Sequence, residues 1–132
     1  MEMFTLDDIK TAHSKVKSGA DFPAYIKELK ALGVFQYETF VADGHVNYCG
    51  TGNYRISSPA KYSPLLIPGN CIVEQFRTGL KEHQQGKTDY MSFIVLCAGS
   101  GVEKWIVDIE QMTCTYFDRG GNEILLEQIP QA

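Results

Sequence analysis

The residues best suited to acid–base chemistry lie around His83. Asp89 follows it, and Cys71 and Cys97 are two of the thiols in the same half of the chain. A histidine can act as acid or base near neutral pH, a carboxylate can orient it, and a thiol can be the nucleophile. A structural role explains the same residues, because a helix dipole favours a histidine at its C-terminus and Asp89 can cap a helix. We therefore assign no catalytic residue and keep His83 as the one candidate.

Two tyrosines, Tyr48 and Tyr116, suggest a ligand site. They occupy equivalent positions in two similar halves of the chain, on strand faces that also carry aliphatic residues. Core packing accounts for both. The alternative is that they face each other where the halves meet, and with His83 form a small-ligand pocket with paired hydroxyl groups.

The sequence gives little support for a metal site or a phosphate-binding loop. Asp43, Asp108 and Glu110 lie near strand ends, but without the spacing of a recognised metal site. Gly120-Gly121 has no strand-to-helix context and is expected to be a turn. We expect no metal and no cofactor.

The elements that position these residues come in two copies, because the chain repeats without gaps at an offset of 68 positions from Asp21 to Ile56. The first helix of each half matches only when the offset drops by one residue, as for Ile9 with Phe76. Identical residues include Asp21 and Asp89, Ile26 and Ile94, Tyr48 and Tyr116, and Gly52 and Gly120. The pattern predicts an ααβββ unit over approximately 5–57, another over 70–129, and a proline-containing connector over 58–69.

In the first half, Thr5 is expected to cap a helix that runs to Gly19, and Asp21 to cap a second that ends at Gly33. Alternation then predicts a strand with Phe35, Tyr37, Thr39 and Val41 on its buried face. Asp43-Gly44 is a hairpin turn, a return strand carries Val46 and Tyr48, and a third strand lies around 54–56.

In the second half, Asn70 is expected to cap a helix that ends at Gly86. The apolar run 93–97 fits a strand or a helix by itself, and its helical counterpart at 25–29 decides for a helix over 89–98. Strands follow around 105–109, 114–116 and 124–128, and the connector residues 65–67 are expected to pack on the core.

The fold class is therefore α+β: one domain over 1–132, an internal duplication of two ααβββ halves with helices packed on antiparallel strands. Whether the strands form one sheet or two stays open.

The strand face opposite the core carries apolar residues where polar ones are expected. Phe40, Ile106 and Phe117 fall on this face, next to Glu38 and Lys104. Exposed together they would form an interaction patch. A homodimer or another protein partner through this face is the favoured explanation, and a covering loop is the alternative.

Charge and composition narrow the partners. The net charge is −4 and Lys and Arg are scattered, which argues against nucleic acid. No apolar stretch is long enough to cross a membrane, and the acidic start MEMFTLDDIK does not resemble an export signal. We expect a cytoplasmic protein with free thiols at Cys49, Cys71, Cys97 and Cys114.

Several motifs carry a resemblance to a known family. These are HQQGKTDY from His83, GVEKW from Gly101, TCTYFD from Thr113, GNEI from Gly121 and the terminal IP at Ile129-Pro130. They resemble the YbcV-like small bacterial family of unknown function, described as phage envelope protein-like. The resemblance runs nearly end to end and implies no established activity. The chain departs from it at the apolar Ile94-Val95-Leu96, which predicts a more buried helix or a partner surface.

The sequence thus predicts a non-enzymatic binding or protein-interaction module that can form a dimer. The alternative is a small enzyme or metabolite-binding protein with a site where the halves meet.

Overall fold

The computed structural model describes residues 4–16 and 21–129. The helices are α1 (Leu6–His13), α2 (Phe22–Leu32), α3 (Val73–Gln84) and α4 (Tyr90–Ser100), with a short 3₁₀ turn, η2, at Thr51–Asn53. The strands are β1 (Val34–Phe40), β2 (Val46–Gly50), β3 (Arg55–Ser57), β4 (Val102–Asp108), β5 (Thr113–Asp118) and β6 (Glu123–Gln128). The α+β class is confirmed. The first helix ends at His13, earlier than predicted, and its predicted end at Gly19 lies outside the described residues.

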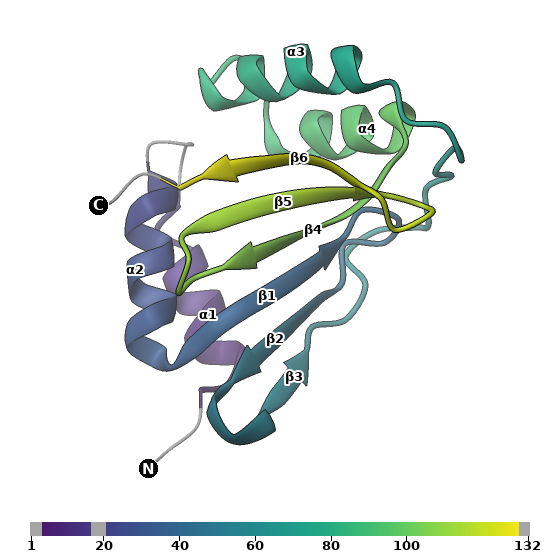
Figure 1. Ribbon diagram of the computed structural model, residues 1–132. Helices are drawn as coiled ribbons and strands as arrows, with labels where there is room; N and C mark the ends of the chain where they lie inside the picture. The colour runs from purple at the N-terminus through teal and green to yellow at the C-terminus, as the bar shows by residue number, and fades with distance from the viewer. Residues whose placement is uncertain (1–3, 17–20, 130–132) are drawn as a thin grey trace.

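All described strands belong to one antiparallel sheet in the order β3-β2-β1-β4-β5-β6 (Figure 1). The question of one sheet or two is thereby answered, because β1 and β4 pair at the centre. The buried strand side chains, among them Tyr37, Tyr48, Trp105 and Tyr116, belong to one core cluster with residues from all four helices. Both helix pairs therefore cover the same face of the sheet.

Helix ends follow local chemistry, with two corrections. Thr5 accepts a hydrogen bond from Asp8 N while Asp8 accepts one from Thr5 N, which confirms the predicted cap. Asp21 makes no side-chain cap, because its own backbone is helical (φ −88°, ψ −7°) whereas a capping residue needs an extended one. Asn70 was expected to cap α3, but the residue before that helix is Ile72 and it makes no side-chain cap.

A β-bulge corrects the predicted orientation of Phe35. The register of β1 with β2 shifts between Val34 and Gln36, and Phe35 is 36% exposed instead of buried. The extra residue of a bulge breaks the alternation on which the prediction relied. The register of β4 with β5 shifts between Val102 and Lys104, 68 positions further on.

The register of the central strands is also related to the repeat. Glu38 in β1 pairs with Ile106 in β4, which is its own counterpart at the offset of 68. Gly33 and Gly101, another such pair, both end their helices in the left-handed conformation, with φ of +100° and +87°.

The connector packs on the core through Tyr62, Leu65 and Ile67. Ile67 is 5% exposed and its carbonyl accepts a hydrogen bond from Arg119, whereas Leu66 is 85% exposed. The prediction that 65–67 pack on the core therefore holds for Leu65 and Ile67 and is wrong for Leu66.

The apolar helix α4 is partly buried and partly on the surface. Ile94 is 0% exposed, and Leu96 packs against α3 at Gly79, where a Cβ would collide with it. Val95, by contrast, is 57% exposed. No helix among the described residues is long and apolar enough to cross a membrane.

Candidate interaction surface

The face of the sheet turned away from the helices carries a row of aromatic and cationic side chains. Phe40 pairs with Lys104 across β1 and β4, and Lys104 pairs with Phe117 across β4 and β5. The Lys104 Nζ lies 5.7 Å from the centroid of the Phe40 ring and 5.6 Å from that of Phe117. A cation within about 6 Å of two ring faces is attracted to both. We call this side of the sheet the open face.

An ion pair anchors this row. Lys104 Nζ lies 2.7 Å from Glu38 Oε2, and their side chains are 27% and 16% exposed. Glu38 also accepts a 3.5 Å hydrogen bond from Asn47 on β2. Because both charges are largely screened from water and held in place, the centre of the open face is a preorganised polar site between aromatic rings.

The β1–β2 turn forms one rim of the face. The His45 ring stacks on Phe40 at 4.3 Å with an interplanar angle of 8°, and its Nδ1 lies 2.6 Å from Asp43 Oδ1. The backbone N–H of His45 donates to the same carboxylate, which lowers the pKa of Asp43. The turn therefore fixes the imidazole against the aromatic row.

The neighbouring row adds aliphatic surface. Ile106 is half-buried between Glu38 and Thr115, its partners across the strands, and Leu126 follows Thr115 on the edge strand with 47% of its surface exposed. The predicted interface residues Phe40, Ile106 and Phe117 thus share one face.

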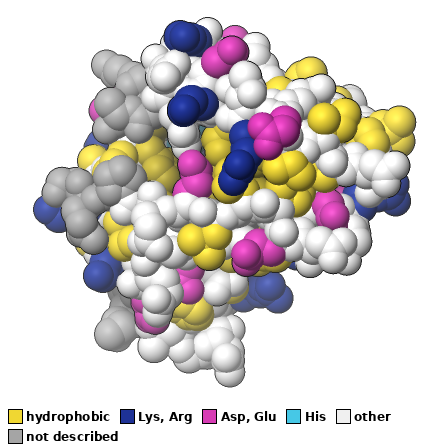
Figure 2. All heavy atoms as spheres, turned by 45° about the horizontal axis from the view of Figure 1, so that its top comes forward, with side chains coloured by type: hydrophobic (Ala, Val, Ile, Leu, Met, Phe, Trp, Pro, Cys, Tyr) yellow, Lys and Arg dark blue, Asp and Glu magenta, His cyan; other side chains and the backbone are white. Residues whose placement is uncertain are grey.

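The open face lies uncovered within the part of the chain that the structure describes. The core cluster draws on the other side of the sheet, and Figure 1 shows both helix pairs away from the open side. In a view turned by 45°, hydrophobic side chains reach the surface between charged and polar ones (Figure 2). The covering loop considered from the sequence is not found among the described residues.

The predicted ligand-site tyrosines are not brought together. Tyr48 lies on β2 and Tyr116 on β5, with β1 and β4 between them, so they are about three strand spacings or roughly 14 Å apart. Both are 6% exposed, and burial raises the pKa of each. Both phenols are therefore protonated core residues.

His83 belongs to the α3–α4 connection. Its Nδ1 lies 3.2 Å from the Thr88 carbonyl and 3.1 Å from Thr88 Oγ1, and its ring stacks on Phe93 at 4.4 Å. Asp89, the proposed orienting partner, instead caps α4 by accepting from Ser92 N at 2.7 Å. These contacts are those of a residue that fixes a helix end.

Replacing His83 by Ala is expected to lower the free energy of unfolding by about 1–2 kcal/mol, since one hydrogen bond and one ring contact are lost. Urea denaturation followed by Trp105 fluorescence measures the change. Lys81→Ala, on the exposed surface of the same helix, should change stability by less than about 0.5 kcal/mol. Equal stability of His83→Ala and wild type would contradict this structural role.

The thiols are free and poorly placed for nucleophilic chemistry. Cys97 and Cys114 are buried, and burial raises the pKa of Cys97 strongly and that of Cys114 to about 12. Burial also raises the pKa of Cys71. A thiol attacks as the thiolate, so these groups are unreactive near neutral pH.

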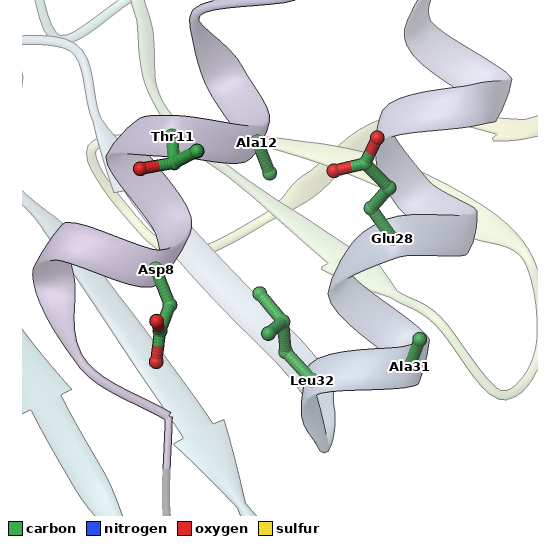
Figure 3. Close-up of a pocket in the computed structure, with 6 residues that line it drawn as sticks. All are labelled: Asp8, Thr11, Ala12, Glu28, Ala31 and Leu32. Carbon is green, nitrogen blue, oxygen red and sulfur yellow. The ribbon is translucent and has the colours of Figure 1, made fainter.

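Two surface hollows do not coincide with any predicted site residue. One, of about 330 Å³, lies between α1 and α2, where Asp8 and Glu28 face it from opposite helices (Figure 3). The other, of about 490 Å³, lies between the start of α1 and β3. Neither is lined by Tyr48, His83 or Tyr116. Among the described residues no cluster of three or more His, Cys, Asp or Glu could hold a metal ion.

A family model covers nearly the whole of this fold. It is described as a protein of unknown function, DUF1398, and it matches residues 10–128. The chain belongs to the DUF1398 family. None of the curated proteins matches this DUF1398 chain. The matched range includes the second half of α1, the helices α2 to α4 and all the strands, so the surface described above belongs to the family domain.

Proposed function

We propose that this DUF1398 chain is a non-enzymatic protein-interaction module whose open face binds a second copy of the chain. The observation that carries the proposal is the row Phe40–Lys104–Phe117 on an uncovered sheet face. Aromatic residues supply most of the energy of a protein interface when they are buried by a partner. A sheet face that contacts only water is expected to carry polar side chains and no row of aromatic ones.

The charges favour a second copy as the partner. Glu38 and Lys104 are adjacent and of opposite sign. Consider a second copy related by a twofold axis that runs parallel to the sheet, above the midpoint between Glu38 and Lys104. In that arrangement Lys104 of each copy faces Glu38 of the other. A C2 interface must be self-complementary in this way. An aromatic row beside a mixed charge pair meets that requirement.

An internal duplication is part of the proposal. It is supported by the matching bulges at Phe35 and Glu103, by the matching helix ends at Gly33 and Gly101, and by the pairing of Glu38 with its own counterpart Ile106. A local twofold axis between Glu38 and Ile106 would relate the halves. The YbcV-like motifs support a place beside that family.

Replacing Phe117 by Asp is expected to dissociate the dimer, with the dissociation constant raised at least about thirtyfold, equivalent to about 2 kcal/mol. The added carboxylate would be buried beside Glu38 of the partner without a free cation. Sedimentation equilibrium over a range of concentrations measures it.

Val95→Asp is the matched control, because Val95 is an exposed apolar residue on α4, away from the open face. It should leave the dimer intact. A wild-type chain that stays monomeric at every concentration, or a dimer broken by Val95→Asp and not by Phe117→Asp, refutes the open face as the interface.

A further inference from the structure

The two ends of the sheet differ in their capacity to accept another strand. β3 has three residues and begins with Arg55, whereas β6 has six and contains Ile124, Leu125 and Leu126. Short or positively charged edge strands resist pairing, and long apolar ones invite it. β6 is the last strand of the sheet in the described part of the chain.

The hydrogen bonds to β5 fix which backbone groups of β6 point outward. Ile129 N donates a hydrogen bond to Met112 O at 2.7 Å, so Ile129 and Met112 form a hydrogen-bonded pair. In an antiparallel ladder every second pair is of this kind, which includes the pair of Glu127 with Cys114. Leu126 and Gln128 lie in the alternate pairs. Their N–H and C=O groups therefore point away from the sheet.

These outward groups are accessible. No hydrogen bond from another described residue reaches the backbone of Leu126 or Gln128 on this side, and both side chains are exposed. Ile124 lies at a bulge, where the register shifts between Tyr116 and Phe117, so the regular part of the edge starts at Leu125.

The charge of this edge selects the partner. β6 contains Glu123 and Glu127 and no Lys or Arg. Glu127 accepts a 2.9 Å hydrogen bond from Gln84 and has no cation beside it in an ion pair among the described residues. A second copy paired antiparallel through both Leu126 and Gln128 would place Glu127 directly opposite its own copy, and like charges in that position are destabilising.

We propose that β6 accepts an extended peptide segment of another protein as an antiparallel seventh strand. The segment carries Lys or Arg opposite Glu127 and β-branched or other apolar residues opposite Leu126 and Gln128. Backbone hydrogen bonds give such strand addition its affinity, and the side chains opposite the edge give its specificity. This site uses the outward backbone edge of β6, shares only Leu126 with the open face, and does not require the dimer.

The probe is a fluorescein-labelled peptide, Thr-Val-Lys-Val-Lys-Val-Thr, compared by fluorescence anisotropy with the same peptide carrying Glu in place of both lysines. Saturable binding of the basic peptide is expected, and binding of the acidic one should be at least about tenfold weaker, because a favourable cross-strand pair becomes a repulsive one. No saturable binding of the basic peptide, or equal binding of the two, overturns the proposal.

Two variants locate the site. Leu126→Pro removes an outward N–H without removing a hydrogen bond to β5, and an edge strand tolerates proline at such a position. This variant should abolish peptide binding, while its Trp105 fluorescence stays that of the folded protein. Glu127→Lys should reverse the preference toward the acidic peptide. Binding that survives Leu126→Pro, or a preference unchanged in Glu127→Lys, refutes β6 as the site.

The proposed dimer is tested separately. Phe117→Asp, which should disrupt the open-face interface, should retain the peptide preference as a monomer. Loss of dimerisation with retained peptide binding supports both proposals, and loss of peptide binding in a folded Phe117→Asp monomer overturns the second.

Discussion

Replacing Gly101 by Ala is expected to lower the free energy of unfolding by about 3 kcal/mol or more, because a left-handed backbone and a steric collision both penalise the new methyl group. Gly101 has φ +87°, and a Cβ there would lie 2.5 Å from Asn70 O and 2.9 Å from Cys71 Cα. These are backbone atoms of residues 70–71, which lead from the connector into α3, so they cannot move aside as the end of a flexible side chain can.

The segment that leads into α3 is held at this point by hydrogen bonds. Ile72 N donates to Ser100 O at 2.8 Å, and Gln75 Nε2 donates to Ser100 Oγ at 2.9 Å. Ser100 is 0% exposed. Relief of the collision would therefore break the contact between the start of α3 and the end of α4.

Gly33→Ala is the matched control. Gly33 is the counterpart of Gly101 in the first half, with φ +100°, but the nearest atom to its added Cβ is Phe4 Cδ1 at 4.0 Å. This variant should lose about 1–2 kcal/mol for the left-handed backbone alone. Urea denaturation with Trp105 fluorescence compares the stability of the two variants. Equal losses would mean that the contact with residues 70–71 does not exclude a side chain at position 101.

The repeat made the order of elements predictable. The apolar run 93–97 is ambiguous alone, and comparison with 25–29 correctly made it part of α4. Turns also followed from local chemistry: Gly44 has φ +79° between β1 and β2. Periodicity, hairpin turns and helix ends are local properties, and each leaves a mark in a short stretch of sequence.

What could not be predicted depends on contacts between distant segments. The pairing of β1 with β4 joins residues 64 to 72 positions apart, and no local pattern encodes it. Phe35 was misplaced because a bulge is set by the register with a partner strand. Asp21 and Asn70 were misassigned as caps because composition does not reveal which residue keeps an extended backbone.

The candidate site was partly visible in the sequence. Alternation placed Phe40, Ile106 and Phe117 on one face, where the structure has them. The bridging role of Lys104 was not found, because it requires knowing that β4 lies between β1 and β5. The proposed pairing of Tyr48 with Tyr116 depended on how the halves meet, which is again a long-range property.

Replacing Phe76 by Ala is expected to lower the free energy of unfolding by about 3–5 kcal/mol. Phe76 on α3 is 0% exposed, and its ring lies edge-on to Tyr116 at 4.9 Å and 6.4 Å from Phe93. It joins the second helix pair to the sheet. Its removal leaves a cavity in a core whose neighbours are bulky rings, which cannot collapse into the space.

Phe35→Ala is the same chemical change on a side chain that is 36% exposed at a bulge, and it should lose less than about 1.5 kcal/mol. Urea denaturation at a protein concentration below that of dimerisation compares the two variants. If Phe76→Ala loses no more than Phe35→Ala, then α3 is not held to the sheet through Phe76. In that case the helices of the second half could detach without loss of the sheet, and contacts other than those of Phe76 would hold the strands of the open face in place.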